Sequence, residues 1–520
     1  MDFATKHKDK IIGTLSGFDR MLFRGILQKL HWGKGMYSYM KQTRTPLFDL
    51  EKHLNSESQL VKDYLENLAK RYKAGFHYLN NSYDSKSERA KSDLEKNPNK
   101  KGLISIIRVL EVSPSFSLKG NRTSKELEIV MEPRRHLHYY LYFNDPEFGW
   151  MFVHLQGRCP YVIKVYVNGR EYLKKALDKE GVKYKAYDNS LTYVKDLDLA
   201  QSLLDNLIDK KWSRFLNAFA RLVNPLAKKM ETTLYQGYQW YTAQSEFATD
   251  IMFRCEETLN LLYPHLVQHA TMFRGAEDIY SFFGRRLDIR SNRVVKGKVK
   301  KYEQGFRVKH IMDSNSIKMY TKTSVLRVET TINKPGAFKI YKESIRKGTP
   351  IMAWVPMGKA VSNLYRHAQV AQQGNDKYLD ALTVINMPDI ELKDKVKQLS
   401  NRVLVRKEGR NDRYYSAFNL LTDQTCLILE AINNAKFCIQ PFSNKSLREI
   451  LITSGVLKFQ DDSPKALKKL SAKVTRLIAK LRAHNLVQKI EGSFKYNITK
   501  TGKHISYQVL AFKNITLVKQ

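Results

Sequence analysis

Hydrophobic and polar positions near the C-terminal end of the chain follow the order helix, helix, long helix, hairpin. Apolar spacing predicts helices over 426–432 and 446–451. Ser463-Pro464 opens a third helix that runs to about residue 481, because proline suits the first helical turn. Residues 487–499 then alternate as two short strands around a turn. This order is typical of a winged helix-turn-helix, and a basic helical bundle ending in a hairpin is the alternative.

The polar side of the third helix is basic, and Lys495 in the hairpin adds a further cation. A winged helix-turn-helix inserts such a helix into the major groove of DNA. The residues predicted to contact nucleic acid here are Lys465, Lys468, Lys469, Lys473, Arg476, Lys480 and Lys495.

Upstream, the pattern changes from helical to strand-like near residue 102. Residues 1–82 are predicted to be mostly helical, including 18–25, and the charged segment 85–101 is a connector or an exposed helix. Alternating runs then predict an antiparallel sheet with strands at 103–109, 127–131, 136–143, 150–155 and 162–167.

Helices are predicted over 170–180, 196–230 and 246–283, followed by a second strand-rich stretch over 307–340 and a helix over 358–382. The expected fold class is therefore α+β and multidomain. A helical N-terminal region with its connector would span residues 1–101. A central antiparallel-sheet domain with helices would span 102–400, and the winged helix-turn-helix 401–520.

Composition favours a polyanionic partner. The chain carries 89 Lys plus Arg against 51 Asp plus Glu, a formal net charge of +38 over 520 residues, and such a field attracts nucleic acid. One basic run contains Arg285, Arg286 and Arg290, which either contact nucleic acid or form a solvated face. DNA is the expected partner, structured RNA the second choice, and the pattern leaves the oligomeric state open.

No apolar run approaches the length of a membrane span, and the N-terminus has no apolar signal core. We therefore expect no membrane partner and a cytoplasmic, nucleoid-associated protein. The four cysteines lie far apart, which predicts reduced thiols and no structural zinc.

The second strand-rich stretch carries the most suggestive chemistry. On two strands joined by a short turn, alternation places Lys318, Tyr320 and Lys322 on one face, and Arg327 and Glu329 on one face of the partner strand. A tyrosine nucleophile, cations that lower its pKa and a carboxylate holding Mg²⁺ or Mn²⁺ suit phosphoryl transfer. Ordinary polarity of a solvated sheet face is the alternative.

Two other clusters are candidate metal ligands. His136 and His138 alternate onto one face of a predicted strand, where they bind a metal ion, or else hydrogen-bond or contact phosphate. Glu246 and Asp250 stand four apart at the start of a predicted helix, where they bind a metal ion or favour the positive end of the helix.

The segment around Tyr320 resembles plasmid rolling-circle replication initiators. Tyr320-Thr321-Lys322 precedes a strand reading Leu-Arg-Val-Glu, as in that family, although Thr321 replaces the usual Asp or Asn. The resemblance implies that Tyr320 nicks DNA and stays joined to the 5′ phosphate, with Glu329 as a metal ligand. His136-Leu137-His138 is similar to the histidine triplet of HUH endonucleases.

The whole chain resembles a widespread family of uncharacterised prokaryotic proteins, through residues 244–250, 327–333 and 481–484. Two hypotheses follow. The first is a metal-dependent DNA-nicking or strand-transfer enzyme of a mobile element. The second is a non-catalytic binder, either a transcriptional regulator or a component of a guide-RNA or structured-RNA ribonucleoprotein. About 400 residues upstream of the winged helix exceed what a simple regulator needs.

Overall fold

The computed structural model describes residues 2–510, except for 81–84, 122–125, 273–278, 280, 284–295, 303–304, 347–348, 384–398, 408–409, 420–421, 435–436, 438–440, 459–462, 500, 504 and 507–508. The predicted nucleic-acid contacts Arg285, Arg286 and Arg290 lie outside the described residues. The chain forms two compact units. The sheet unit contains His7–Glu256 and Lys309–Lys377, and the second unit contains the remaining segments.

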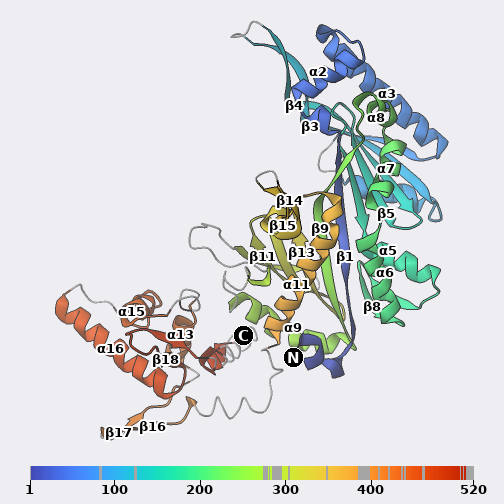
Figure 1. Ribbon diagram of the computed structural model, residues 1–520. Helices are drawn as coiled ribbons and strands as arrows, with labels where there is room; N and C mark the ends of the chain where they lie inside the picture. Colours follow the sequence, from blue (N-terminus) through green and yellow to red (C-terminus); the bar gives the residue numbers. More distant parts are fainter. Residues whose placement is uncertain are drawn as a thin grey trace. The chain divides into compact units, whose positions relative to one another are not determined.

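A large, mostly antiparallel sheet organises the sheet unit (Figure 1). Its strands include β1 (Ile11–Ile26), β2 (Gly75–Leu79), β3 (Gly102–Gly120), β4 (Leu127–Asp145), β5 (Gly149–Gln156), β6 (Ile163–Asn168), β9 (Gln239–Phe253), β11 (Gly305–Met312), β12 (Asn315–Lys322) and β13 (Val325–Ile332). Their order across the sheet is β11-β12-β13-β9-β1-β6-β5-β4-β3-β2. From β12 to β3 the described pairings are antiparallel, whereas β2 pairs parallel to β3.

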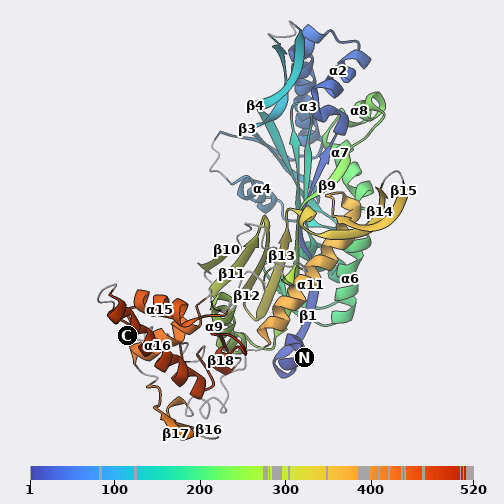
Figure 2. The same cartoon turned by 60° about the vertical axis from the view of Figure 1, so that its left-hand side comes forward.

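Helices lie on both sides of this sheet. In Figure 2, α4 (Lys86–Glu95) lies on one side of the sheet, and α7 (Trp212–Val223) and α11 (Leu364–Leu382) on the other. The ring of Trp212 in α7 lies 4.7 Å from that of Phe23 in β1. In α11, Asn375 accepts a hydrogen bond from the Thr330 hydroxyl of β13.

Strand β1 extends beyond the end of β6, and two helices flank the extension. They are α5 (Gly169–Lys179) and α6 (Leu197–Asp209). The Gln201 side chain of α6 accepts a hydrogen bond from the Ser16 backbone N–H and donates one to the Ser16 carbonyl. An added Cβ at Gly13 would come within 2.3 Å of Leu197, so glycine allows this close approach.

One hairpin, β7 (Tyr184–Tyr187) with β8 (Ser190–Val194), reaches the site described below through its turn. The remaining elements of the sheet unit are α2 (Gly33–Gln42), α3 (Leu50–Arg71), α8 (Ala227–Leu234), the hairpin β14 (Lys339–Arg346) with β15 (Thr349–Pro356), and the 3-10 turns Lys8–Lys10, Gln28–His31, Leu47–Asp49, Pro335–Ala337 and Val361–Asn363.

The second unit holds α1 (Phe3–Lys6), α9 (Glu256–Met272), β10 (Lys296–Tyr302), the hairpin β16 (Val403–Lys407) with β17 (Arg410–Tyr415), α13 (Asp423–Ile432), α15 (Asn444–Thr453), α16 (Pro464–Ala483), and the hairpin β18 (Val487–Lys489) with β19 (Tyr496–Ile498). From α13 to β19 the order matches the predicted helix, helix, long helix, hairpin. As predicted, Ser463 caps α16 and Pro464 is its first residue. Leu429, Leu447 and Ile478 belong to the hydrophobic core that these elements share.

Two predictions of helix are wrong. Residues 18–25 form the second half of β1, where Met21 and Phe23 are buried and Arg24 is exposed, which is the period of a strand. The predicted helix 246–283 is wrong at its start, because residues up to Phe253 lie in β9, whereas Glu256–Met272 form α9. From Ser245 onward β9 is buried on both faces, and a continuously buried strand shows no alternation that would set it apart from a helix.

Several other predictions differ from the structure in their boundaries. Residues 127–131 and 136–143 form one strand, β4, and 196–230 is divided among α6, α7 and α8. The charged segment 85–101 contains a helix, α4, whose Ala90 is buried. No helix among the described residues is both long enough and apolar enough to cross a membrane.

Candidate active site

A bulge in β1 brings two charged residues to one position of the sheet. Phe18 pairs with Phe247 and Met21 with Ser245, so the one residue between those partners, Glu246, faces both Asp19 and Arg20. Bulges of this kind redirect side chains. Asp19 and Arg20 consequently meet Glu246 in the middle of the sheet.

Glu329 completes a group of three buried carboxylates on three adjacent strands. Oxygens of Asp19 (β1), Glu246 (β9) and Glu329 (β13) all lie within 4.8 Å of one another. Glu246 is only 6 % exposed, and its Oε2 accepts no hydrogen bond among the described residues. Arg20 Nη1 lies 3.9 Å from the same Oε2. We call Asp19, Glu246 and Glu329 the carboxylate trio.

Two side chains of β12 contact the trio, and both were predicted from sequence. Lys318 Nζ lies 2.5 Å from Glu329 Oε1 and 3.5 Å from Glu246 Oε1. The Tyr320 hydroxyl donates a hydrogen bond of 2.7 Å to Glu329 Oε2. The pairing of β12 with β13 explains these contacts, since Lys318 is directly opposite Glu329 and Tyr320 opposite Arg327.

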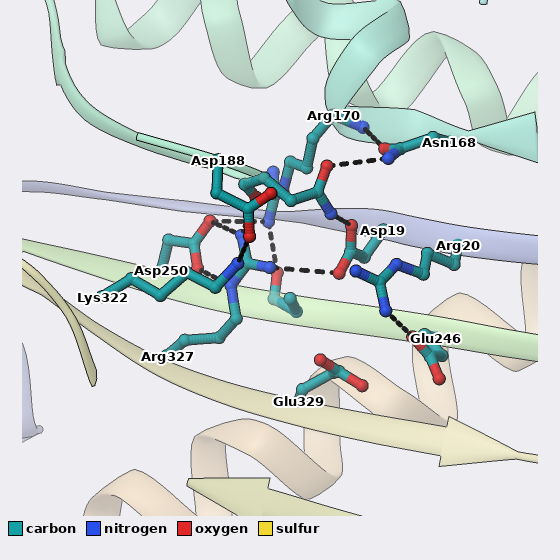
Figure 3. Close-up of polar contacts among 12 residues, drawn as sticks. Asp19, Arg20, Asn168, Arg170, Asp188, Glu246, Asp250, Lys322, Arg327 and Glu329 are labelled. Carbon is teal, nitrogen blue, oxygen red and sulfur yellow. Dashed lines mark hydrogen bonds and ion pairs between the residues drawn. The ribbon is translucent and has the colours of Figure 1, made fainter. Parts of the chain in front are cut away.

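A fully buried ion-pair network supports the trio from one side (Figure 3). Arg327 binds Asp250 through Nε (2.5 Å) and Nη2 (2.8 Å), and its Nη1 lies 3.1 Å from Asp19 Oδ2. The Arg327 Nη2 also donates to the Asn189 carbonyl at 2.6 Å, and Arg170 reaches Asp250 at 3.1 Å. Asp250 is thus saturated by arginines, which leaves it unsuited to the predicted role of metal ligand.

These neighbours shift the ionisation of the site in opposite directions. Burial opposes ionisation of Glu329, but the Lys318 ammonium and the hydrogen bonds from Lys318 and Tyr320 lower its pKa to about 2. Burial and the nearby Glu329 carboxylate raise the pKa of Glu246. Burial and Glu329 also raise the pKa of the Tyr320 phenol well above its usual value. Tyr320 therefore carries its proton at neutral pH unless more positive charge enters the site.

His136 and His138 share a face of β4, as predicted, but β4 is five strand steps away from β13. At about 4.8 Å per step this is roughly 24 Å. The two imidazoles are stacked 4.8 Å apart, and His138 Nδ1 lies 2.8 Å from His154 Nε2. The structure does not bring these histidines to Tyr320 or Glu329, so one metal ion cannot join the two groups.

His138, His154 and Glu111 have the donor types of a metal site, with their atoms within 4.8 Å of one another. The charge around them opposes a cation, however. Lys86 Nζ lies 3.2 Å from Glu111, and both Lys86 and Lys164 depress the pKa of His138, although burial is the main cause and brings it to about 4. We therefore regard this group as a hydrogen-bonded cluster of neutral histidines.

The other predicted site residues are distributed as follows. Lys322 lies on the face of Tyr320 but forms an ion pair with Asp188. On α16, Lys465, Lys468, Lys469, Lys473 and Arg476 are exposed, as is Lys495 beside β19. Lys480 instead packs inward, where its Nζ donates to the Ala417 carbonyl and lies over the Phe418 ring.

Sequence reasoning missed Asp19 and Arg20 because their segment was assigned to a helix. A usable signal existed, since Asp19 is the only acidic residue in the largely apolar and basic stretch 10–30. A carboxylate inside such a stretch is buried only if it is paired or binds a ligand.

Comparisons with known proteins returned no match: no family model, no curated protein and no solved structure matches this chain.

Proposed function

We propose that the protein is a divalent-metal-dependent enzyme that cleaves or transfers a nucleic-acid strand, with DNA as its substrate. The observation that carries the proposal is the carboxylate trio, three buried acids whose oxygens converge while Glu246 Oε2 accepts no hydrogen bond. Carboxylate oxygens are the ligands that Mg²⁺ and Mn²⁺ prefer. A bound ion would relieve the repulsion that raises the pKa of Glu246 and would neutralise charge on a phosphodiester.

Tyr320 is the proposed nucleophile. Its oxygen would attack the phosphorus and the 3′ oxygen would leave, so that the 5′ phosphate becomes joined to the tyrosine. The phenol already donates its proton toward Glu329, 2.7 Å away. Its raised pKa makes attack unfavourable without added positive charge, which is why the proposal requires a cation at the trio.

Lys318 and Arg20 would act on the substrate side of the same site. Lys318 is partly exposed between Glu329 and Glu246, and the Arg20 side chain is 46 % exposed. A cation that is partly desolvated and held by acids is well placed to stabilise the charge that develops on a phosphoryl group.

The elements from α13 to β19 are proposed to be a winged helix-turn-helix that reads DNA. The support is their order, the shared core and the row of exposed cations on α16. We also propose that the protein belongs to a prokaryotic mobile element, which rests on the resemblance to rolling-circle initiators around Tyr320.

A second function is favoured by one specific contact. The Lys318 ammonium lies within 4 Å of both Glu329 and Glu246, so the chain itself supplies a counter-ion for the acids. If that ammonium stays in place, the trio is a structural ion network and the protein is a non-catalytic DNA-binding or RNA-binding protein.

One experiment separates these functions. Purified protein is incubated with labelled single-stranded DNA pools in Mg²⁺, Mn²⁺ or EDTA, and products are resolved on a denaturing gel. Wild type is compared with Glu246→Gln, with Tyr320→Phe and with Glu66→Gln, a control at an acid that is 42 % exposed on α3.

A metal-dependent, protein-linked 5′ fragment that disappears in Glu246→Gln and Tyr320→Phe but persists in Glu66→Gln is expected. Cleavage without a protein adduct in Tyr320→Phe would assign the attack to water and refute the tyrosine. Intact DNA in every metal, with binding retained on a native gel, would establish the non-catalytic function instead.

A further inference from the structure

One face of the sheet beside the carboxylate trio is open. Along the second half of β1, Met21, Phe23 and Gly25 are buried, whereas Arg20 and Arg24 are exposed. The same alternation continues on β6, where Lys164 and Tyr166 are partly exposed between buried valines and isoleucine. The partly exposed residues of both strands share one face, because directly paired residues point to the same side of a sheet.

Two cations face each other on this side, and neither forms an ion pair with a described carboxylate. Arg24 pairs directly with Lys164 across β1 and β6. Within the described part of the chain, neither side chain makes an ion pair or a hydrogen bond. Like charges directly opposite on neighbouring strands destabilise a sheet. Burial and the Arg24 cation lower the pKa of Lys164, and the Glu111 carboxylate, which forms no ion pair with Lys164, only partly offsets this effect.

An aromatic row runs beside the cations, one step along the same face. Tyr166 pairs with Phe152 of β5, and their rings stack with centroids 5.2 Å apart and planes at 7°. Phe152 in turn packs on the ring of Tyr142, 5.7 Å away. Phe152 also packs against the small hydrophobic cluster that contains Ala90 of α4. Tyr166 is therefore the end of the aromatic row that lies nearest β1. Lys164 and Tyr166 are two residues apart along β6, about 7 Å.

This face is continuous with the trio. Leu22 pairs with Tyr166 on one side and with Gln244 on the other, and Gln244 donates a hydrogen bond to Glu246 Oε1 at 2.9 Å. Arg20, one of the residues at the bulge, lies beside the same glutamate. A ligand that lies over Arg24, Lys164 and Tyr166 would thus lead directly to the carboxylates.

We propose that this face binds single-stranded nucleic acid, with Arg24 and Lys164 on a backbone phosphate and Tyr166 stacked on a base. A phosphate is the ligand that removes the repulsion between the two cations. An unpaired base supplies the flat apolar surface that an aromatic ring at the end of a stack can cover, whatever its sequence. Duplex ends and protein segments offer no such alternation of unpaired base and phosphate. The inference deepens the proposed function, on which its link to strand cleavage rests.

The test is equilibrium binding of the full-length protein to fluorescent single-stranded DNA, single-stranded RNA and duplex DNA in EDTA, over a series of salt concentrations. The variants are Arg24→Gln, Lys164→Met, which keeps most of the aliphatic stem, the double variant, and Tyr166→Ala. Lys70→Gln is the control, because Lys70 is a 71 % exposed lysine on α3, away from this face.

For single strands, the double variant should reduce the slope of log affinity against log salt by about 0.7, the contribution of one phosphate, and each single cation variant should reduce it by less. Tyr166→Ala should weaken binding about tenfold with no change in slope. Duplex binding should stay unchanged in all of them. Comparable losses of affinity for single-stranded DNA and single-stranded RNA would indicate recognition of the phosphate backbone. A loss of affinity for only one of the two nucleic acids would indicate that the sugar is recognised as well.

Thermal melting of each variant distinguishes loss of binding caused by unfolding from loss of a contact with the ligand. Because Arg24 and Lys164 repel each other, Arg24→Gln and Lys164→Met should leave the melting temperature unchanged or raise it. Unchanged salt slopes in well-folded variants, or equal losses for single strands and duplex, would overturn the proposal.

Failure of this inference and failure of the proposed function are distinguishable. Binding is measured without metal, and Glu246→Gln should bind single strands like wild type. Normal single-strand binding by the Arg24 and Lys164 variants, together with metal-dependent cleavage by wild type, would remove the inference and keep the proposed function. Lost single-strand binding in those variants, without any cleavage by wild type, would keep the inference and remove the proposed function.

Discussion

Arg327 and Asp250 lie directly opposite each other on β13 and β9 and are joined by two hydrogen bonds, of 2.5 and 2.8 Å. Both side chains are almost completely buried. Arg327 also contacts Asp19 of β1 and the Asn189 carbonyl between β7 and β8. One guanidinium thus joins four segments that are far apart in the sequence, and it fixes the position of Asp19 in the carboxylate trio.

Removing the charge of Asp250 should therefore destabilise the protein strongly. In Asp250→Asn the buried Arg327 and Arg170 lose their main counter-ion, and breaking a buried pair from one side costs about 3–5 kcal/mol. Urea unfolding monitored by circular dichroism measures the change in unfolding free energy. Asp188→Asn is the matched control, because Asp188 pairs with Lys322 at a 65 % exposed position and should change stability by less than about 1 kcal/mol. A similarly small effect of Asp250→Asn would show that the network does not stabilise the fold.

Binding of a metal ion at the trio should stabilise the folded protein. At a free Mn²⁺ concentration of about one hundred times the dissociation constant, the gain is about 2.7 kcal/mol. Thermal unfolding with increasing Mn²⁺ should show a rising melting temperature for wild type and Glu66→Gln, and a much smaller rise for Glu246→Gln. Equal shifts in all three proteins would place the ion elsewhere, and no shift in any of them would argue for Lys318 as the permanent counter-ion.

Acid should destabilise the sheet unit through its histidines. Burial lowers the pKa values of His136 and His138 to about 4, whereas the unfolded chain has histidines near 6.5. The unfolded state therefore binds more protons between these values, so stability present above pH 6.5 is lost as the pH falls toward 4. With a difference of about 2.5 units, the limit is on the order of 3 kcal/mol per histidine.

Glu246 acts in the opposite direction, since its pKa is raised and its folded form holds a proton more tightly than the unfolded chain does. The histidine effect is best measured in the Glu246→Gln background, by urea unfolding at pH 7, 5.5 and 4.5. Replacing His136 and His138 together by glutamine should flatten the pH dependence. An unchanged dependence of the unfolding free energy on pH would mean that other groups cause the loss of stability in acid.

Parts of the site were predictable because they depend only on alternation along a strand. Lys318 and Tyr320 were placed on one face, and they meet Glu329 as expected. Glu246 and Asp250 were placed on one face of a helix and occupy one face of β9, because positions four apart share a face in both structures.

Other parts depend on pairings that no local pattern contains. The meeting of Asp19 with Glu246 requires the bulge in β1 and the choice of β9 as its neighbour, although Glu246 comes 227 residues after Asp19 in the sequence. The separation of His138 from Glu329 follows from the strand order, in which β9, β1, β6 and β5 come between their strands. Periodicity within a strand carries no information about which strands pair or about their order across the sheet.

The basic side of α16 should contribute to DNA affinity mainly through charge. Lys468, Lys469 and Lys473 are exposed, and no ion pair of theirs occurs among the described residues. Replacing all three by glutamine should weaken duplex binding and lower the slope of log affinity against log salt by up to about 2.7, because each phosphate contact contributes about 0.9. Fluorescence anisotropy with duplex DNA over a salt series measures both quantities.

Lys480 provides the control on the same helix. Its ammonium donates to the Ala417 carbonyl and lies 4.1 Å from the Phe418 ring centroid, so Lys480→Met should leave the salt slope unchanged. If the triple variant left the salt slope unchanged, α16 would not be the helix that faces the phosphates. If Lys480→Met lowered the slope as much as a single exposed lysine does, Lys480 would contact phosphate and would not be a valid control. Retained single-strand binding by the triple variant would in turn show that the open face of the sheet unit binds its ligand independently.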